Sequence, residues 1–280
     1  MGPVSADTSL PTCYVHPDRE TRLACSSCGR PACVDCVQRA PVGQKCRDCA
    51  APEGNARVIT ASDVRAGARG ATPVTFTILA VAVAVHVVGL VLPEVGERIF
   101  AAGAQVNPLV ERGEWYRLFT AAFLHSPAGF THILFNMFAL YLFGPQLERQ
   151  AGSVPFATLY LASALAGGAA FALSSPGGVA VGASGAIFGL FGAWLAASLR
   201  SRHTPAGAAG LRQLLLVLGL NLALPLFVPG IAWEAHLGGL VAGFVIAFLW
   251  FSLRDRSRVG LLRTVVAALV GAAALALVAL

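Results

Sequence analysis

The longest uncharged stretch of this chain sets the first constraint on its fold. Fifty consecutive residues between Arg149 and Arg200 carry no charged side chain, and most of them are small or apolar. A helix rises about 1.5 Å per residue, and roughly 20 apolar residues cross the hydrocarbon of a membrane. Fifty residues are therefore too many for one crossing, and the turn-forming segment SSPGG at 174–178 divides them. The pattern predicts two membrane spans here.

The other apolar stretches, measured in the same way, bring the total to seven spans. Hydrophobic residues make up 56% of the 280 residues and charged residues only 12%, which excludes an ordinary soluble protein. We predict an all-α polytopic membrane protein, a helical bundle with spans at about 74–93, 131–147, 154–173, 183–199, 213–229 and 234–252 and a seventh within 254–280. The long outer loop between the first two spans, 94–130, is expected to lie in the membrane interface, with Trp115 and Tyr116 at headgroup depth.

Arginines in the short loops predict the orientation. With the N-terminus in the cytoplasm, the inner loops carry eight arginines, whereas the outer connections carry three, offset by four glutamates. The positive-inside rule therefore favours a multi-pass protein of the cell membrane with a cytoplasmic N-terminus and an extracytoplasmic C-terminus. We interpret the net charge of +6 as this topology signal, and we expect no nucleic-acid partner.

All seven cysteines precede the first predicted span. Together with one histidine they form four pairs with two residues between the members: Cys13 and His16, Cys25 and Cys28, Cys33 and Cys36, Cys46 and Cys49. Eight such ligands complete two tetrahedral zinc sites. Disulfides, the alternative, leave an odd cysteine and give His16 no role. The spacing does not decide which pairs share a metal ion.

The order of these pairs resembles cross-braced, B-box-type zinc fingers, which bind two zinc ions. Sites closed by four protein ligands have no open position for catalysis. We therefore predict a zinc-binding cytoplasmic head at 1–50 with two structural zinc ions, which docks a cytoplasmic protein partner or serves a regulatory role. Residues 51–72, rich in Ala, Gly and Arg, are predicted to be its linker to the first span.

Few ionisable or strongly polar side chains lie inside the predicted spans, and such groups are functional candidates because lipid penalises them. The second, fourth and sixth spans run in the same direction, so His132, Ser184 and His236 near their starts lie at one depth, just below the outer surface. A hydroxyl with an imidazole as general base can form a serine hydrolase site. Asn136 shares the helix face of His132 at i+4.

Glycines near Ser184 and His236 predict that their two helices pack closely. They are Gly185, Gly189 and Gly192 on one helix and Gly239 and Gly243 on the other. The remaining polar residues are interpreted as structural or solvated: His86 and Asn221 as packing groups, Glu234 as a span-end residue, and His125 and His203 as solvated loop residues.

Four segments together resemble the rhomboid family of intramembrane serine proteases: GASG around Ser184, AHLGGLVAG from Ala235, HILFN from His132 and WYRLFTAAFLH from Trp115. The resemblance covers about residues 74–252, so the predicted core is 73–253, and 254–280 is the extra helix of the seven-span form. It implies a catalytic dyad of Ser184 as nucleophile and His236 as general base, with no catalytic cofactor. It also implies an oxyanion hole made by His132, Asn136 and the backbone N–H of Ser184.

The sequence therefore predicts a serine-type endopeptidase that cleaves transmembrane protein substrates in the lipid bilayer near its outer face. A catalytically silent rhomboid-like protein that binds or escorts membrane proteins is the alternative. Silent relatives lack the serine or the histidine, and this chain has both. A channel or transporter predicts inverted repeats and polar groups near mid-bilayer, and we find no convincing repeat.

Overall fold

The computed structural model describes residues 10–40, 43–50, 71–127, 129–253 and 258–279. They belong to two compact units, Met1–Ala66 and Gly67–Leu280, which we describe separately. The predicted linker, 51–72, lies outside the described residues except for its last two. The first four residues of the predicted segment 254–280 and its last one also lie outside them.

The N-terminal unit has very little apolar core. Strand β1 (Val37–Arg39) pairs antiparallel with β2 (Gln44–Cys46), and the short helix α1 (Arg47–Ala50) follows directly. Its buried cluster consists of five cysteines and one alanine: Cys13, Cys25, Ala32, Cys33, Cys36 and Cys46. A core of this size is too small to stabilise a domain by burial alone.

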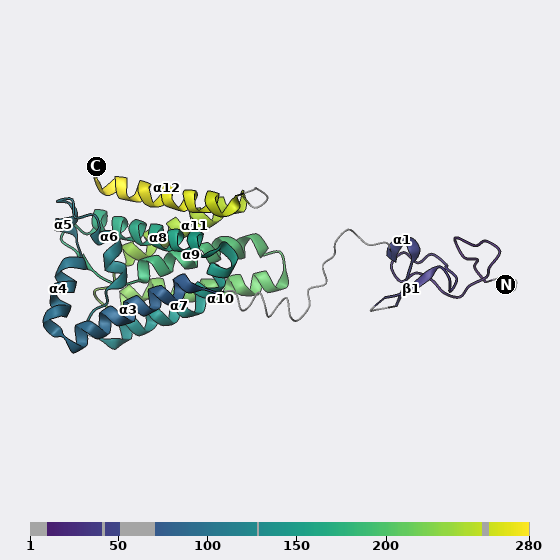
Figure 1. The fold of residues 1–280 in the computed structure, drawn as a ribbon, viewed down its shortest axis with the longest axis horizontal. Coiled ribbons are helices and arrows are strands. Elements are labelled where there is room, and N and C mark those ends of the chain that lie inside the picture. Colours follow the sequence, from purple (N-terminus) through teal and green to yellow (C-terminus); the bar gives the residue numbers. More distant parts are fainter. Residues whose placement is uncertain (1–9, 41–42, 51–70, 128, 254–257, 280) are drawn as a thin grey trace, which may run out of the picture. The chain divides into compact units, whose positions relative to one another are not determined.

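The second unit is a bundle of long helices that run side by side (Figure 1). In chain order they are α3 (Pro73–Val91), α7 (Phe130–Ala151), α8 (Ser153–Ser174), α9 (Ser184–Ser201), α10 (Pro205–Ala223), α11 (Trp233–Phe251) and α12 (Val259–Ala279). Among the described residues, five helical segments are long and apolar enough to cross a membrane: α3, α8, Gly207–Leu226, α11 and α12. Gly207–Leu226 combines most of α10 with the 3₁₀ turn η2 (Leu224–Leu226). The protein is therefore a multi-pass membrane protein.

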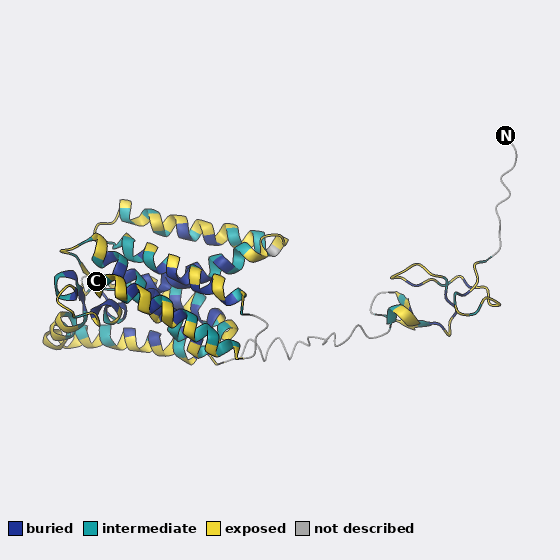
Figure 2. Ribbon diagram, turned by 90° about the horizontal axis from the view of Figure 1, so that it is seen from above, coloured by how far each residue is buried: buried dark blue, intermediate teal, exposed yellow. Residues whose placement is uncertain are grey.

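Helix α9 has the largest buried fraction of the long helices, with ten of its 18 residues buried, against eleven of 22 in α8. In Figure 2 the inward helix faces of this unit are dark blue and the outward faces are largely yellow. Helices α9 and α11 meet backbone to backbone. A Cβ added to Gly239 would overlap the carbonyl oxygen of Gly185, and one added to Gly243 would overlap that of Gly189. Small residues thus allow the close helix approach that the sequence predicts.

The predicted outer loop, 94–130, is itself folded. It contains α4 (Pro93–Gly103), α5 (Asn107–Val110), α6 (Arg117–Thr120) and the 3₁₀ turn η1 (Ala121–Phe123). Arg117 donates through Nη1 to the carbonyl oxygens of Ala101 and Ala104, 2.8 Å each, and so satisfies acceptors at the end of α4. Strand β3 (Gln105–Val106) pairs antiparallel with β4 (Val179–Ala180), which joins the loop to the chain that leads into α9.

Burial in this loop differs from one expectation. Trp115 and Tyr116 are half-exposed, but His125, predicted to be solvated, is only 6% exposed. That prediction is wrong because the loop folds back onto α7, where the ring of His125 packs edge-on against His132 with centroids 5.2 Å apart. His203 is exposed, as expected.

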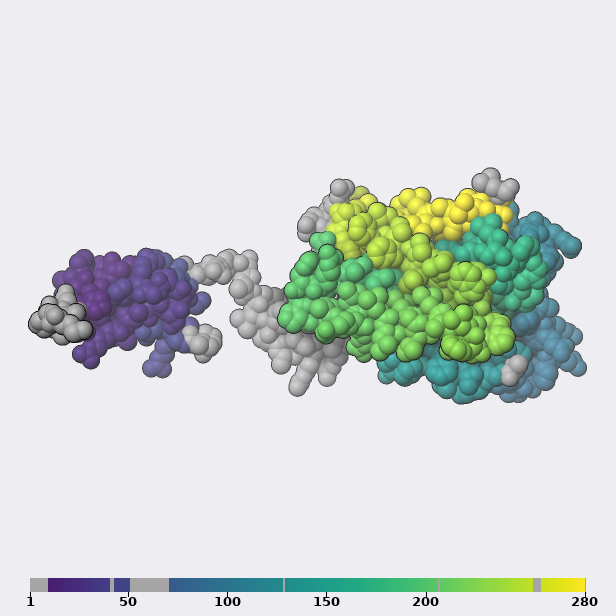
Figure 3. Space-filling view, turned by 180° about the vertical axis from the view of Figure 1, so that it is seen from behind, coloured from purple at the N-terminus to yellow at the C-terminus, as the bar shows by residue number. Residues whose placement is uncertain are grey.

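Different contacts hold α3 and α12 at the edges of the bundle. The buried carboxylate of Glu148, on α7, accepts from the backbone N–H of Val74 and Thr75 and from the Thr75 hydroxyl, at 2.7–3.0 Å. Helix α12 packs on α8, where a Cβ added to Gly271 would lie 3.2 Å from Ala162. Helix α10 contributes many exposed leucines to the outer surface, and Figure 3 shows a face to which α10 (green) and α12 (yellow) both contribute.

Candidate active site

Ser184 and His236 lie at the starts of two neighbouring helices. Ser184 is the first residue of α9, and His236 lies in the first turn of α11. The Nε2 atom of His236 is 2.9 Å from Oγ of Ser184. The imidazole is 8% exposed and stacks on the Phe188 ring, with centroids 4.2 Å apart and planes 8° from parallel. The stack restricts ring rotation and keeps Nε2 directed at the hydroxyl.

No carboxylate completes a triad in the described part of the chain. The Nδ1 atom of His236 is buried and has no hydrogen-bond partner there. Glu234 accepts instead from the hydroxyl of Ser175, at 3.4 Å, where α8 ends. The arrangement is a serine–histidine pair, and an adjacent imidazole base can by itself activate a serine hydroxyl.

The side chains of His132 and Ser184 both approach Gly182. A Cβ added to Gly182 would lie 2.8 Å from Nε2 of His132 and 3.8 Å from Oγ of Ser184. Gly182 has φ of +132°, which L side chains rarely adopt, and its N–H donates to the Ala121 carbonyl at 2.9 Å. The N–H of Ser184 is among the first four amides of α9, which have no acceptor inside the helix. The ring of His132 and the N–H of Ser184 are therefore candidate donors to one substrate oxygen.

Asn136 lies one helical turn after His132 on α7 and is buried. Its Nδ2 donates to the His132 carbonyl at 2.8 Å, within its own helix. A side-chain amide has two N–H donors, so a second remains for a ligand. The structure thus brings Ser184, His236 and His132 together. One N–H of the Asn136 amide is already used in a hydrogen bond to the backbone of α7.

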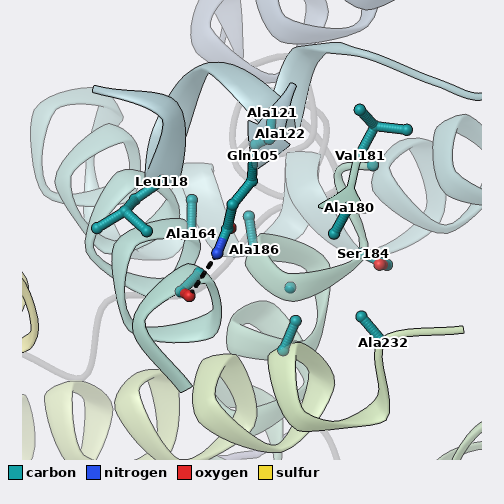
Figure 4. Close-up of a pocket in the computed structure, with 14 residues that line it drawn as sticks. Gln105, Leu118, Ala121, Ala122, Ala164, Ala180, Val181, Ser184, Ala186 and Ala232 are labelled. Atoms are coloured by element: carbon teal, nitrogen blue, oxygen red, sulfur yellow. Dashed lines mark hydrogen bonds between the residues drawn. The ribbon is translucent and has the colours of Figure 1, made fainter. Parts of the chain in front are cut away.

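A small cavity of about 40 Å³ lies beside Ser184 (Figure 4). Many of its lining side chains are alanines: Ala121, Ala122, Ala164, Ala180, Ala186, Ala232 and Ala235. Gln105 also lines it and donates through Nε2 to the Gly168 carbonyl and to Oδ1 of Asn107, 2.8 Å each. Sequence reasoning missed Gln105, because a single glutamine in a loop carries no spacing signal, and it included Gly182 only as the first residue of the GASG segment, without a role.

The head contains a second kind of site. Its eight predicted ligands form two groups: Cys13, His16, Cys33 and Cys36, and Cys25, Cys28, Cys46 and Cys49. The ligand atoms within each group lie within 4.8 Å of one another. The first pair thus shares a group with the third, and the second pair with the fourth, which the spacing alone left open.

Both groups have the dimensions and donor chemistry of a tetrahedral zinc site. With zinc–sulfur bonds of about 2.3 Å, the ligands of a tetrahedron are about 3.8 Å apart. The Cys28 and Cys46 sulfurs are 3.8 Å apart, and His16 Nδ1 is 3.4 Å from the sulfurs of Cys33 and Cys36. The Arg30 guanidinium donates to Cys28 Sγ at 3.4 Å and lowers the pKa of that thiol, which favours the thiolate that binds metal.

Comparison with known proteins agrees with this geometry. A model of the rhomboid domain matches residues 112–253, which include Ser184, His236, His132 and Asn136. The chain is 39% identical over 148 residues to YdcA of Bacillus subtilis strain 168, covering 52% of this chain and 73% of that protein.

Two further relatives share the same region. The rhomboid protease GluP of Bacillus subtilis is 39% identical over 151 residues, which is 54% of this chain and 29% of GluP. RHOMBOID-like protein 1 of Arabidopsis thaliana is 38% identical over 146 residues, 52% of this chain and 37% of that protein. The zinc-ligand groups lie outside the matched domain. From the domain match and these identities, the chain belongs to the rhomboid family.

Proposed function

We propose that this chain is an intramembrane serine endopeptidase that cleaves transmembrane protein substrates near the outer face of the membrane. The observation that supports it most is the 2.9 Å approach of His236 Nε2 to Ser184 Oγ, beside a small cavity. Membership of the rhomboid family supports the same activity, since GluP is named a rhomboid protease.

In the proposed acylation step, Ser184 Oγ attacks the carbonyl carbon of the scissile peptide while His236 Nε2 takes the hydroxyl proton. The carbonyl π electrons move to the oxygen, which accepts from the Ser184 N–H, His132 Nε2–H and Asn136 Nδ2–H. A preorganised donor of this kind contributes about 3 kcal/mol to transition-state stabilisation. His236 then gives its proton to the leaving nitrogen, the C–N bond breaks, and an acyl-enzyme on Ser184 remains.

Water completes the cycle without a catalytic cofactor. His236 takes a proton from a water molecule whose oxygen attacks the acyl carbon, and the same oxyanion donors stabilise the second tetrahedral intermediate. Its collapse breaks the bond to Ser184 Oγ, which regains the proton from His236. The reaction consumes one water molecule, so the site must be reachable by water.

We infer that all seven long helices cross the membrane, with a cytoplasmic N-terminus and an extracytoplasmic C-terminus. Helices α7 and α9 have 22 and 18 residues, which at about 1.5 Å per residue approaches or exceeds the hydrocarbon thickness. Burial of α9 among its neighbours explains why it needs less apolar surface. In this orientation the N-terminal ends of α7, α9 and α11, with His132, Ser184 and His236, face the outside.

The cavity beside Ser184 limits the substrate. Its alanine-rich lining and volume of about 40 Å³ support a small side chain at the residue before the scissile bond. A peptide in a helix hides its carbonyl carbon from attack, so the substrate span must present an extended segment. We expect helix-breaking residues near the outer end of that span.

For the head we propose two structural zinc ions, held in the crossed pairing of its ligand groups, and a docking role toward a cytoplasmic protein. The donor sets of four ligands support closed sites without catalytic function. Zinc would supply most of the folding free energy of this unit, because its core is small.

The test is cleavage of a single-span reporter by the purified full chain in liposomes. Ser184→Ala and His236→Ala should each lower kcat by about 10⁴-fold or more. Ser201→Ala, at the exposed end of the same helix α9, and His203→Ala, in the following loop, should cleave like the wild type. Absence of wild-type cleavage over a panel of helix-broken reporters would favour the silent binding protein. Residual cleavage by Ser184→Ala would show that the nucleophile is another group.

A further inference from the structure

His125 is a buried polar residue without an assigned role. Its side chain is 6% exposed, and within the described residues neither ring nitrogen has a hydrogen-bond partner. A neutral imidazole has one donor and one acceptor. Leaving both unsatisfied away from water costs about 1–3 kcal/mol each, and buried polar groups without a protein partner are generally satisfied by ordered water. The position of His125 therefore calls for a nearby source of water.

Such a source lies directly beside it. A cavity of about 370 Å³, here called the rear cavity, lies between α3, α4 and the chain that precedes α7. Its lining is mainly apolar, with three polar side chains, His86, Glu97 and His125. One buried water needs only about 10–15 Å³ of such volume and two or more polar partners. The rear cavity is roomy and polar enough for several waters, and it shares no lining residue with the cavity beside Ser184.

On its other side, His125 contacts His132, one of the proposed oxyanion donors. Its ring packs edge-on against His132, with centroids 5.2 Å apart and planes 61° apart. Nε2 of His132 in turn lies close to Gly182, and Oγ of Ser184 lies close to the same glycine. His125 is thus the one residue that both lines the rear cavity and makes a ring contact with His132 in the described chain.

We propose that His125 is a positioning residue for the oxyanion hole: water in the rear cavity hydrogen-bonds to His125, and the fixed His125 ring keeps the His132 ring turned with Nε2 toward the substrate oxygen. The proposal rests on the proposed proteolytic function. His125 does not touch the substrate in this role. An oxyanion donor acts only when its N–H is already aligned, and a misalignment of the ring lowers kcat without weakening substrate binding.

The main test is a double-mutant cycle on reporter cleavage in liposomes. His125→Phe keeps an aromatic ring against His132 but removes both nitrogens. We expect kcat to fall between about tenfold and a hundredfold, because complete loss of one oxyanion donor costs about 10² to 10³. KM should stay within about twofold. The double variant His125→Phe/His132→Ala should be no slower than His132→Ala, since His125 acts through His132.

A second pair of variants tests the rear cavity from the opposite wall. Val85→Phe, on α3, adds bulk to a residue that lines the cavity, which reduces the volume open to water and leaves His125 itself unchanged. Val88→Phe places the same bulk on the same helix at a position that does not line the cavity. We expect Val85→Phe to lower kcat with unchanged KM. Val88→Phe should leave both kcat and KM unchanged. His203→Phe, a histidine change at an exposed position, is the control for the substitution itself.

The outcomes separate the positioning role from the proposed function. Absence of wild-type cleavage would overturn both. Wild-type cleavage together with unchanged kcat in His125→Phe, or with independent, multiplicative losses in the double variant, would overturn the positioning role alone. Wild-type kcat in Val85→Phe would overturn the part played by water. If His125→Phe does not fold, His125→Gln retains a donor and an acceptor, and the same cycle with it should again show no additional loss beyond His132→Ala.

Discussion

The head and the membrane unit hold functional side chains at fixed distances by opposite means. In the head, five of the eight ligand residues, together with one alanine, make up the buried cluster. In the membrane unit, which has no cysteine, α9 and α11 reach contact because Gly239 and Gly243 have no side chains. We propose that the first unit depends on metal ions that join its ligands, whereas the second depends on glycines, whose lack of side chains lets two helices touch. Removing metal from the head should therefore leave the membrane unit intact, and replacing a packing glycine in the membrane unit should leave the head intact.

The largest expected effect is on the head. Removing metal from the full chain with a strong chelator should unfold it, because structural zinc contributes about 10–16 kcal/mol to the folding of small zinc domains. Alkylation followed by mass spectrometry measures this directly, since all seven cysteines are in the head and none is in a disulfide among the described residues. We expect about two zinc ions released per chain and full alkylation after chelation.

Reporter cleavage by the same sample provides the comparison. The membrane unit has its own packing and uses no cofactor in the proposed reaction, so kcat should stay unchanged after chelation. Loss of cleavage in step with zinc release would contradict the independence of the two units. Rapid alkylation of all seven cysteines before chelation would contradict the zinc sites themselves.

The next largest effect is expected at Gly182. In Gly182→Ala, the new methyl group would lie 2.8 Å from Nε2 of His132, so the ring of this proposed oxyanion donor must shift, and φ of +132° adds strain. We expect kcat to fall by about 10² to 10³, the loss typical for an oxyanion donor. Gly177→Ala, in the same connection between α8 and α9 and with open space around its Cβ, should cleave like the wild type. Similar rates for the two variants would move the oxyanion site elsewhere.

Much of the helical framework could be predicted from the sequence because membrane thickness limits helix length. The predicted spans 74–93 and 234–252 correspond to α3 (Pro73–Val91) and α11 (Trp233–Phe251). Helix α10 differs: it begins at Pro205, well before the predicted 213. The prediction used Arg212 as a boundary, but charge marks where lipid ends and not where a helix begins. Thr204 caps α10 instead, with its hydroxyl oxygen accepting from the Gly207 N–H at 3.0 Å.

The candidate site also contains some residues that the sequence could predict and others that it could not. Ser184, His236 and His132 could be found because polar groups at one depth of a membrane are rare. The burial of His125 and the place of Gln105 could not, because they follow from contacts between segments distant in the sequence. His125 is buried by the return of the loop onto α7, and Gln105 reaches Gly168 on α8. The local amino-acid sequence does not predict such contacts.

A smaller effect is expected where α9 and α11 meet. In Gly243→Ala, the added methyl group overlaps the carbonyl oxygen of Gly189, so the helices must separate slightly. We expect a loss of about 1–3 kcal/mol in unfolding free energy, the range for overpacking, and a lower thermal transition of the membrane unit. Gly219→Ala, on α10 with nothing within 4 Å of the new Cβ, should be neutral or slightly stabilising. Equal transitions for both variants would contradict packing through glycine.

The smallest expected effect is again in the head, where one substitution should distinguish the two ligand groups. Arg30 donates to Cys28 Sγ at 3.4 Å and pairs with Asp48 at 2.8 Å, so its hydrogen bonds reach the ligands of one group, whereas near the other group it only stacks on the Tyr14 ring, 4.6 Å from the centroid. In Arg30→Met we expect zinc release from Cys25, Cys28, Cys46 and Cys49 to accelerate by about tenfold, as for other supporting contacts around a metal site. In the same variant, zinc release from the group that contains His16 should keep its wild-type rate. In the control Arg22→Met, at an exposed position, zinc should leave both groups at wild-type rates. Site-resolved alkylation under chelator measures the two rates, and equal acceleration at both groups would mean that Arg30 stabilises the whole head instead of one zinc site.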